Sequence, residues 1–213
     1  MALVRPAATP AGALAESVPP SANRLLTELG ILEAVEGAGF HPNRGNMVWW
    51  AGRDPRRETF AEAESGFHCD REGLESVLGR AAESIGVRLY DGLTARTADE
   101  STEGWSVVCE ASDGSAVELR APWVLDATGR HGFLARREGR EPDRSTTTIA
   151  LVRRWEKPGG WEPDTIGHTL VESYVDGWAW SVPLTAGLRC FTAMVDQRHA
   201  DLEGLPTRRM RKR

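Results

Sequence analysis

Three short segments combine residue types that suit a phosphate-bearing or aromatic ligand. Arg71 stands in the first turn of an expected helix, where a guanidinium beside free backbone N–H groups can face a pyrophosphate or a polarised ring carbonyl. Residues 126–129 end an apolar run in small residues, and such a turn lets the backbone come close to a ligand. Trp178 and Trp180 alternate along an expected strand, so they share one of its faces. A solvated arginine and a tryptophan-rich sheet face are the structural alternatives.

The other reactive side chains indicate neither a metal centre nor an assignable general acid or base. Cys69, Cys109 and Cys190 are widely spaced and odd in number, so we expect buried, reduced thiols rather than a disulfide framework or a metal site. His41 and His68 are candidates for acid–base work by residue type alone. A structural or solvated role is the alternative for both histidines.

Composition describes an ordinary globular protein. Of the 213 residues 40% are hydrophobic and 27% charged, which argues against wholesale disorder. The formal net charge of −5 supplies no general attraction for nucleic acid or anionic membrane. No apolar run approaches the roughly 20 residues of a membrane-spanning helix, and no targeting segment is evident. We therefore expect a cytoplasmic protein without a nucleic-acid or membrane partner.

Helical spacing is clearest over residues 70–85. Apolar residues repeat there at intervals of three and four: Leu74, Val77, Leu78, Ala81, Ala82 and Ile85. Asp70 suits the N-cap and Gly86 the C-cap. After Pro20 the pattern predicts two short helical turns, capped by Ser21 and interrupted at Gly30. Residues 37–58 read as a loop region with one short strand at 47–51.

Two groups of β-type segments follow. Residues 87–95, 105–111 and 115–121 alternate like a half-exposed antiparallel meander, after which residues 123–125 form a continuous apolar run typical of a buried parallel strand. A second sheet is predicted from four further runs, at residues 146–155, 168–175, 177–184 and 188–195.

Four segments together resemble the FAD-dependent monooxygenases and halogenases that share the para-hydroxybenzoate hydroxylase type of fold. AESVPPSANRLLTELGI at 15–31 is similar to their Gly-Glu-Ser segment, HCDREGLESVLGRAA at 68–82 to their arginine-bearing helix start, and WVLDATGRHG at 123–132 to their cofactor loop. DGWAWSVPL at 176–184 resembles a halogenase Gly-Trp-x-Trp-x-Ile-Pro signature. The resemblance implies cofactor contacts from Glu16, Ser17, Arg71, Asp126, Ala127 and Gly129, and a substrate-side wall of Trp178, Trp180 and Pro183.

The resemblance also implies a fold class, α/β (α+β), with an incomplete FAD-binding Rossmann-like layer and an antiparallel substrate-domain β-sheet. We expect a single partial flavoprotein body. Residues 1–140 would be a remnant of the FAD-binding domain with a β-meander, 141–198 the substrate-domain sheet, and 199–213 a basic tail. No G-x-G-x-x-G turn and no later Gly-Asp motif occur, so the sequence looks truncated at both ends.

By this resemblance the function is an FAD-dependent oxidoreductase that performs a monooxygenase-type oxidation of an aromatic or tryptophan-like small molecule. A flavin reductase or NAD(P)H would supply electrons. Whether this chain binds FAD alone stays open, and a non-catalytic or partner-dependent fragment is the alternative. Halogenation is disfavoured, because that chemistry uses a lysine and none precedes Lys157, while an arginine stays charged and cannot act as a neutral amine.

Overall fold

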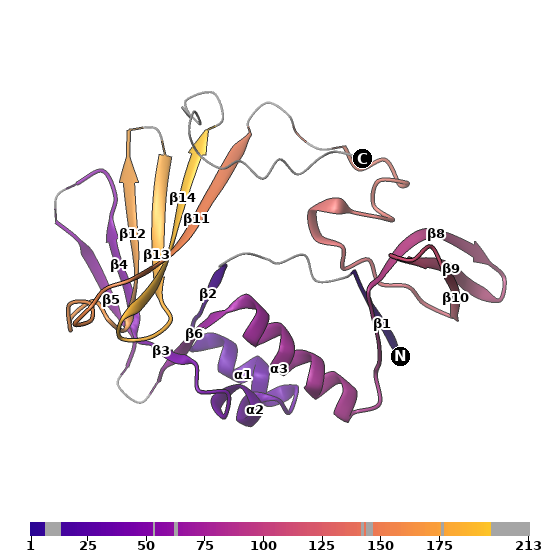
Figure 1. The fold of residues 1–213 in the computed structure, drawn as a ribbon, viewed down its shortest axis with the longest axis horizontal. Helices are drawn as coiled ribbons and strands as arrows, with labels where there is room; N and C mark the ends of the chain where they lie inside the picture. The colour runs from indigo at the N-terminus through magenta and orange to yellow at the C-terminus, as the bar shows by residue number, and fades with distance from the viewer. Residues whose placement is uncertain are drawn as a thin grey trace. The chain divides into compact units, whose positions relative to one another are not determined.

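A computed structural model describes residues 1–6, 14–52, 54–61, 64–141, 143, 147–175 and 177–196 (Figure 1). The predicted basic tail, residues 199–213, lies outside the described residues. The chain divides into a first unit of Met1–Gly12, Glu33–Ala38 and Glu72–Asp143, and a second unit of Ala13–Leu32, Gly39–Arg71 and Arg144–Arg213. Both units are discontinuous in sequence, and the division of a single partial flavoprotein body at residue 140 stays a prediction.

The first unit contains a parallel strand pair and the long helix. β1 (Ala2–Arg5) pairs in parallel with β7 (Arg88–Asp91), and α3 (Arg71–Ser84) immediately precedes β7 in the chain. A Cβ on Gly79 of α3 would lie 3.1 Å from the Arg5 guanidinium and 3.6 Å from Leu89, so the glycine lets the helix approach both strands closely. The predicted helix is confirmed: α3 begins at Arg71, so Asp70, which ends the preceding strand, occupies the predicted position immediately before the helix.

The predicted meander is confirmed in part. β8 (Leu93–Ser101), β9 (Gly104–Ala111) and β10 (Ala116–Ala121) form an antiparallel three-stranded sheet in the order β10-β9-β8. Residues 88–91, expected to belong to the same run as β8, instead form β7 and pair with β1. Gly92, with φ of +79°, allows the chain to turn between β7 and β8, because a positive φ is accessible to glycine without strain.

The predicted buried strand at residues 123–125 is wrong. These residues have no regular secondary structure, and the side chains of Trp123 and Leu125 are 83% and 88% exposed. A buried parallel strand needs neighbours that satisfy its backbone and cover both faces. Within the described residues no strand flanks this segment, so its apolar pattern alone is not enough to form a strand.

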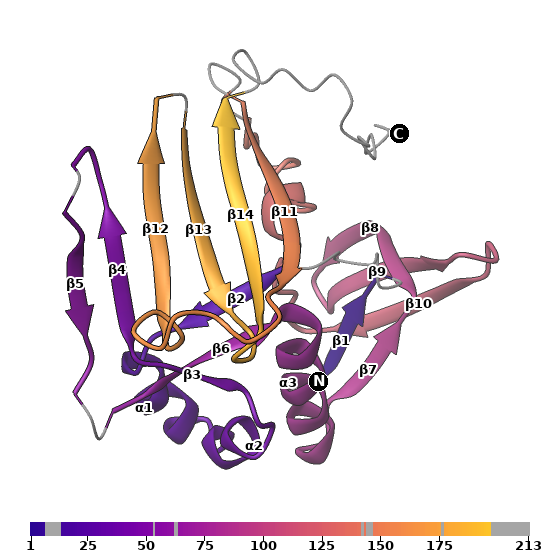
Figure 2. The same ribbon diagram turned by 60° about the vertical axis from the view of Figure 1, so that its left-hand side comes forward.

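The second unit is built on a six-stranded sheet with the order β11-β14-β13-β12-β4-β5 (Figure 2). All four predicted β-type runs are strands: β11 (Thr148–Glu156), β12 (His168–Tyr174), β13 (Gly177–Pro183) and β14 (Leu188–Asp196). They are joined by β4 (Gly45–Trp49) and β5 (Arg56–Thr59), and the β4–β12 pairing is parallel. The sheet is therefore mixed rather than wholly antiparallel, while the α/β class is confirmed.

A smaller antiparallel sheet completes the second unit. Its order is β2-β6-β3, with β2 (Ala15–Val18), β6 (Gly66–Asp70) and β3 (His41–Asn43). Ala15 of β2 joins the buried core formed by Val182 and Cys190 of the larger sheet. This contact ties the small sheet to β13 and β14, so residues of β2 have fixed positions relative to them.

Helices follow β2 as the sequence predicts. α1 (Ser21–Glu28) and α2 (Leu32–Glu36) are separated at Gly30, whose φ is +70°. The expected cap by Ser21 is wrong, because Pro20 already has helical dihedral angles, occupies the N-cap, and leaves Ser21 as the first helical residue. Among the described residues no helix is long and apolar enough to span a membrane.

Candidate functional site

Glu16 and Arg71 form an ion pair across the small sheet. β2 and β6 pair in the register that places Ala15 opposite Asp70, and the Arg71 N–H extends this pairing by donating to the Leu14 carbonyl at 3.1 Å. The Arg71 side chain therefore reaches Glu16, with Nε 2.6 Å from Oε1 and Nη2 in contact with the same oxygen. Both contacts go to one carboxylate oxygen, so the half-exposed guanidinium keeps N–H donors for another oxygen-bearing group.

Ser17 follows Glu16 on β2 and is hydrogen-bonded to the larger sheet. Its Oγ is 2.6 Å from Oγ1 of Thr169 on β12 and accepts a hydrogen bond of 3.1 Å from Nδ2 of Asn43 on β3. Asn43 and Thr169 are buried, whereas Ser17 is exposed. The structure thus brings Glu16 and Arg71, two of the predicted cofactor contacts, into an ion pair, and a third, Ser17, follows Glu16 directly on β2.

A group of buried cationic and titratable side chains supports that edge. His68 Nε2 lies 3.0 Å from Thr169 Oγ1, and the His68 ring stacks on His41 with centroids 6.3 Å apart. Burial, reinforced by nearby His41, Arg189 and His168, lowers the pKa of His68 to about 3. His68 is therefore neutral near pH 7, and among the described residues it has no carboxylate partner that would favour the charged form.

The guanidinium of Arg189 is fully buried and donates hydrogen bonds to three main-chain oxygens. Nη1 donates to the Thr165 carbonyl at 3.0 Å, and Nη2 donates to the carbonyls of His168 and Ser181 at 2.8 and 3.2 Å. Burial lowers the pKa of Arg189 to about 10. Its partners are main-chain oxygens, so its structural function is to hold the loop before β12 against β13.

The tryptophan pair forms as the sequence predicts. Trp178 and Trp180 stack with ring centroids 5.0 Å apart, and Trp50, in the segment after β4, lies 6.5 Å from Trp178. Trp180 also packs against the core, whereas Trp50 is largely exposed. Pro183 is buried and occupies the alternate position of β13, so the strand places it on the face opposite the two indoles.

The remaining predicted contacts, Asp126, Ala127 and Gly129, lie in the first unit. Asp126 Oδ1 accepts from the Thr128 N–H at 3.0 Å and from the Thr128 hydroxyl at 2.6 Å. Oδ2 accepts from the Leu134 and Ala135 N–H groups at 2.8 and 3.3 Å. These donors, with the Thr128 hydroxyl contributing most, hold the pKa of Asp126 well below its usual range. The carboxylate organises its own loop, and Ala127 and Gly129 lie exposed within it.

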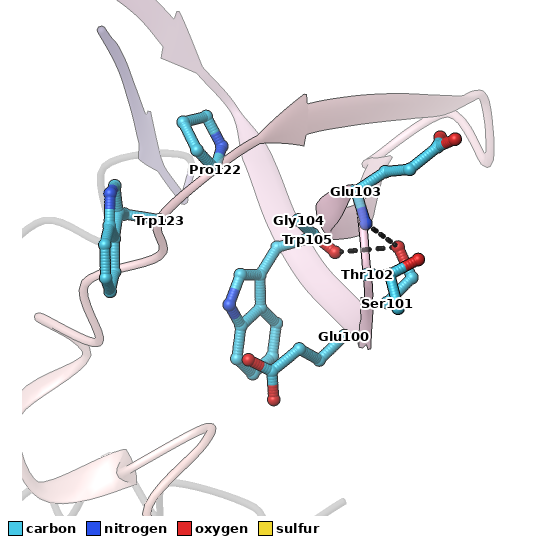
Figure 3. A pocket seen from close by; sticks show the side chains of 8 residues that line it. All are labelled: Glu100, Ser101, Thr102, Glu103, Gly104, Trp105, Pro122 and Trp123. Atoms are coloured by element: carbon cyan, nitrogen blue, oxygen red, sulfur yellow. Dashed lines mark hydrogen bonds between the residues drawn. The ribbon is translucent and has the colours of Figure 1, made fainter.

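A pocket of about 300 Å³ also lies in the first unit (Figure 3). It is formed by the β8–β9 hairpin and residues 122–123, and the Glu100 side chain lies beside the indole of Trp105 in it. None of the predicted site residues lines it, so we do not identify it with the candidate site.

Metal and thiol chemistry have no support in the described part of the chain. No cluster of three or more histidine, cysteine or carboxylate side chains suitable for a metal ion occurs there. Cys69, Cys109 and Cys190 are buried and form no disulfide bond within that part of the chain, as predicted. Burial raises the pKa of each thiol, that of Cys69 to about 12, so these residues stay protonated and unreactive near pH 7.

Sequence comparison matches residues 45–203 to the model of the tryptophan halogenase family. A flavin-dependent halogenase of Armillaria mellea, armH3, is 26% identical over 190 residues, covering 82% of this chain and 37% of that protein. Tryptophan 2-halogenase of Chondromyces crocatus is 28% identical over 193 residues, covering 85% of this chain and 36% of that protein. The chain thus spans well under half the length of these relatives.

Solved structures share the fold. CmlS, a flavin-dependent halogenase, superposes with a TM-score of 0.81 at 22% identity, over 92% of this chain and 37% of its own. The peptidyl tryptophan dihydroxylase QhpG gives a TM-score of 0.63 at 23% identity, over 97% of this chain and 41% of its own. At such identities the likeness shows a common fold alone.

Proposed function

The chain belongs to the tryptophan halogenase family, and from this premise we propose that it forms part of a flavin-dependent oxidoreductase acting on an electron-rich aromatic small molecule. The observation that carries the proposal is the Glu16–Arg71 ion pair, with Ser17 next to Glu16 on β2, at the residues where the sequence resemblance expects flavin contacts. Bound, reduced FAD would provide the chemistry with molecular oxygen on which the oxidation depends.

The residues present fit part of an FAD site. An exposed guanidinium with remaining N–H donors suits a phosphate or ring carbonyl oxygen, and Ser17 is also an exposed residue. The stacked indoles of Trp178 and Trp180 would form the substrate-side wall and exclude water, with Pro183 supporting their strand from behind. In the first unit the backbone at Ala127 and Gly129 would approach the cofactor, while Asp126 would shape the loop.

Halogenation is the leading reaction. The lack of a lysine before Lys157 disfavours it, but the family match and the curated relatives named as halogenases support it better than a generic monooxygenase. By analogy with these relatives, the proposed partners are a small aromatic substrate and a flavin reductase or NAD(P)H as electron source.

Hydroxylation remains a second candidate because of one specific observation. Lys157 is the first lysine in the chain, and its ammonium is paired with Glu162 at 2.5 Å and lies 5.4 Å above the Trp161 ring. A lysine held in this way is not a free amine for halogen transfer. The likeness to a tryptophan dihydroxylase fold is compatible with an oxygen-transfer reaction.

The first test is retention of FAD, measured by visible absorbance and flavin fluorescence on the purified chain and on the complete gene product. We expect Arg71→Ala to weaken binding by at least tenfold, whereas Arg80→Ala, on the same helix but bonded to Ser76, should leave it unchanged. A folded complete protein that takes up no FAD would refute the proposal.

Product analysis then separates the two reactions. The FAD-loaded complete protein is supplied with reduced flavin, oxygen and an indole substrate, with and without bromide. A brominated product that requires bromide supports halogenation. A hydroxylated product that forms equally in both conditions supports the second candidate.

A further inference from the structure

A continuous line of hydrogen bonds connects exposed Ser17 to buried His68. Ser17 Oγ lies 2.6 Å from Thr169 Oγ1, which lies 3.0 Å from His68 Nε2. The residue His68 is only 1% exposed, and Thr169 only 6%. The line therefore runs from the core of the second unit to the strand edge where the cofactor is proposed.

Asn43 fixes the role of the Ser17 oxygen at the outer end. Asn43 Oδ1 accepts from the Gly45 N–H at 3.2 Å, which identifies the other amide atom as Nδ2. That nitrogen donates to Ser17 Oγ and to the Val18 carbonyl, both at 3.1 Å. One lone pair of the Ser17 oxygen is thereby occupied, and the direction of the Ser17–Thr169 bond decides where the Ser17 proton goes.

The tautomer of His68 decides that direction. Nδ1 of His68 is buried and has no partner among the described residues. A proton on Nδ1 would leave a buried N–H donor unpaired, an arrangement that is rarer in proteins than an under-used acceptor. A proton on Nε2 instead leaves only a lone pair unpaired. The favoured arrangement has His68 Nε2–H donating to Thr169 and the Thr169 hydroxyl donating to Ser17.

In that arrangement Ser17 Oγ accepts from both Asn43 and Thr169, so its two lone pairs are filled. Its hydroxyl proton is left to donate away from the core, and Ser17 is exposed. We propose that His68, acting through Thr169, is a positioning residue that presents the Ser17 hydroxyl as a hydrogen-bond donor to an oxygen or nitrogen atom of the flavin. This inference rests on the proposed flavin site. It adds that Ser17 is the donor in one flavin contact and that His68 and Thr169 set the direction of that hydrogen bond.

The line of hydrogen bonds from His68 through Thr169 to Ser17, which we call the relay, can be tested without cofactor, by ¹⁵N nuclear magnetic resonance on histidine-labelled protein. We expect His68 to be the Nε2–H tautomer with a slowly exchanging ring proton. Thr169→Val, which keeps the shape but removes the hydroxyl, should make that proton exchange rapidly, and Thr169→Ser should retain its protection. An Nδ1–H tautomer, or a valine variant with unchanged exchange, would overturn the relay.

The contact with flavin is tested on the complete protein. Ser17→Ala and Thr169→Val should each weaken FAD binding by roughly three- to tenfold, as expected for one hydrogen bond, and shift the visible flavin absorbance. Thr169→Ser should restore both properties. Normal binding by all three variants would overturn the inference while leaving the flavin site intact. Failure of the unmodified protein to bind FAD would instead refute the proposed function and the ligand named here, and the tautomer measurement would still decide the relay.

Discussion

Arg189 on β14 donates through Nη2 to the main-chain oxygen of His168 at 2.8 Å, in the buried interior of the second unit. The same guanidinium reaches the carbonyls of Thr165 and Ser181, so one side chain satisfies three backbone acceptors on two segments. A buried cation without a carboxylate is costly to desolvate, and here the planar array of donors offsets that cost.

We expect Arg189→Met to lower the free energy of unfolding by about 2–4 kcal/mol, because buried carbonyl oxygens lose charged donors. Arg189→Lys should also be destabilising, since an ammonium cannot reach acceptors spread along a planar fork. Urea denaturation measures both changes, and Arg153→Met on exposed β11 is the matched control. A stability unchanged by Arg189→Met would show that these carbonyls find other partners.

The lowered pKa of His68 predicts how the free energy of unfolding depends on pH. Its pKa is about 3 in the folded chain, against 6.5 for an ordinary histidine, so between these values the unfolded state binds more protons. The contribution of His68 to the free energy of unfolding is therefore complete above about pH 6.5 and is lost as pH falls toward 3. The free energy of unfolding changes by up to about 1.4 kcal/mol per pH unit in this range. Burial lowers the pKa of His168 as well, which adds in the same direction.

Urea titrations at about pH 7.5, 6 and 5 should show this loss of stability. His68→Gln should be less stable at pH 7.5 but should show a shallower decline with acidification, because the titrating group is gone. The same slope in both proteins would place the acid sensitivity elsewhere.

The sequence predicted the elements whose pattern is local and failed where distant partners decide. The helix at α3 and the strands β11–β14 follow from periodicity and turn residues. Residues 123–125 carry an equally apolar pattern but have no flanking strands in the described chain. Strand β5 was missed because its arginines suggest a loop, although charged residues are common on an edge strand.

The candidate site shows the same difference between residues found from a local pattern and residues that depend on distant partners. Glu16, Ser17 and Arg71 were found because they lie in recognisable segments. Thr169 was missed, since it is 152 residues from Ser17 in sequence and a threonine in a strand carries no signal of its own. Arg189 could have been noticed, because it interrupts a largely apolar strand beside Cys190, where a solvated arginine is unexpected.

Asp126 should act as the organiser of its loop. Asp126→Ala removes the acceptor for the N–H groups of Thr128, Leu134 and Ala135, so we expect faster hydrogen exchange at these amides. Asp113→Ala, which removes a similar bond to Ser115 in the β9–β10 turn, is the control and should affect its own turn only. Unchanged exchange around Asp126 would mean that other contacts hold the loop.

A substitution at Gly129 tests the backbone conformation of the same loop. Its φ is +63°, and a Cβ there would meet no atom within 4 Å. The expected cost of Gly129→Ala is therefore conformational rather than steric, about 1 kcal/mol, and thermal denaturation of the variant measures it. Gly139→Ala, with φ of +87° and equally open surroundings, should cost a similar amount. A much larger loss at Gly129 alone would indicate a backbone approach that open space does not explain.

The stacked indoles of Trp178 and Trp180 should give a coupled signal in circular dichroism, because their rings are 5.0 Å apart. Trp178→Phe and Trp180→Phe should each abolish this signal, whereas Trp123→Phe, at an exposed position, should not. The two alanine variants should differ in stability. Trp180→Ala should cost roughly 2 kcal/mol more than Trp178→Ala, since Trp180 also packs against the core formed by Ala15, Val182 and Cys190. If the costs were equal and the coupled signal survived either phenylalanine change, the two side chains would not form the stacked wall on which the substrate side of the proposed site depends.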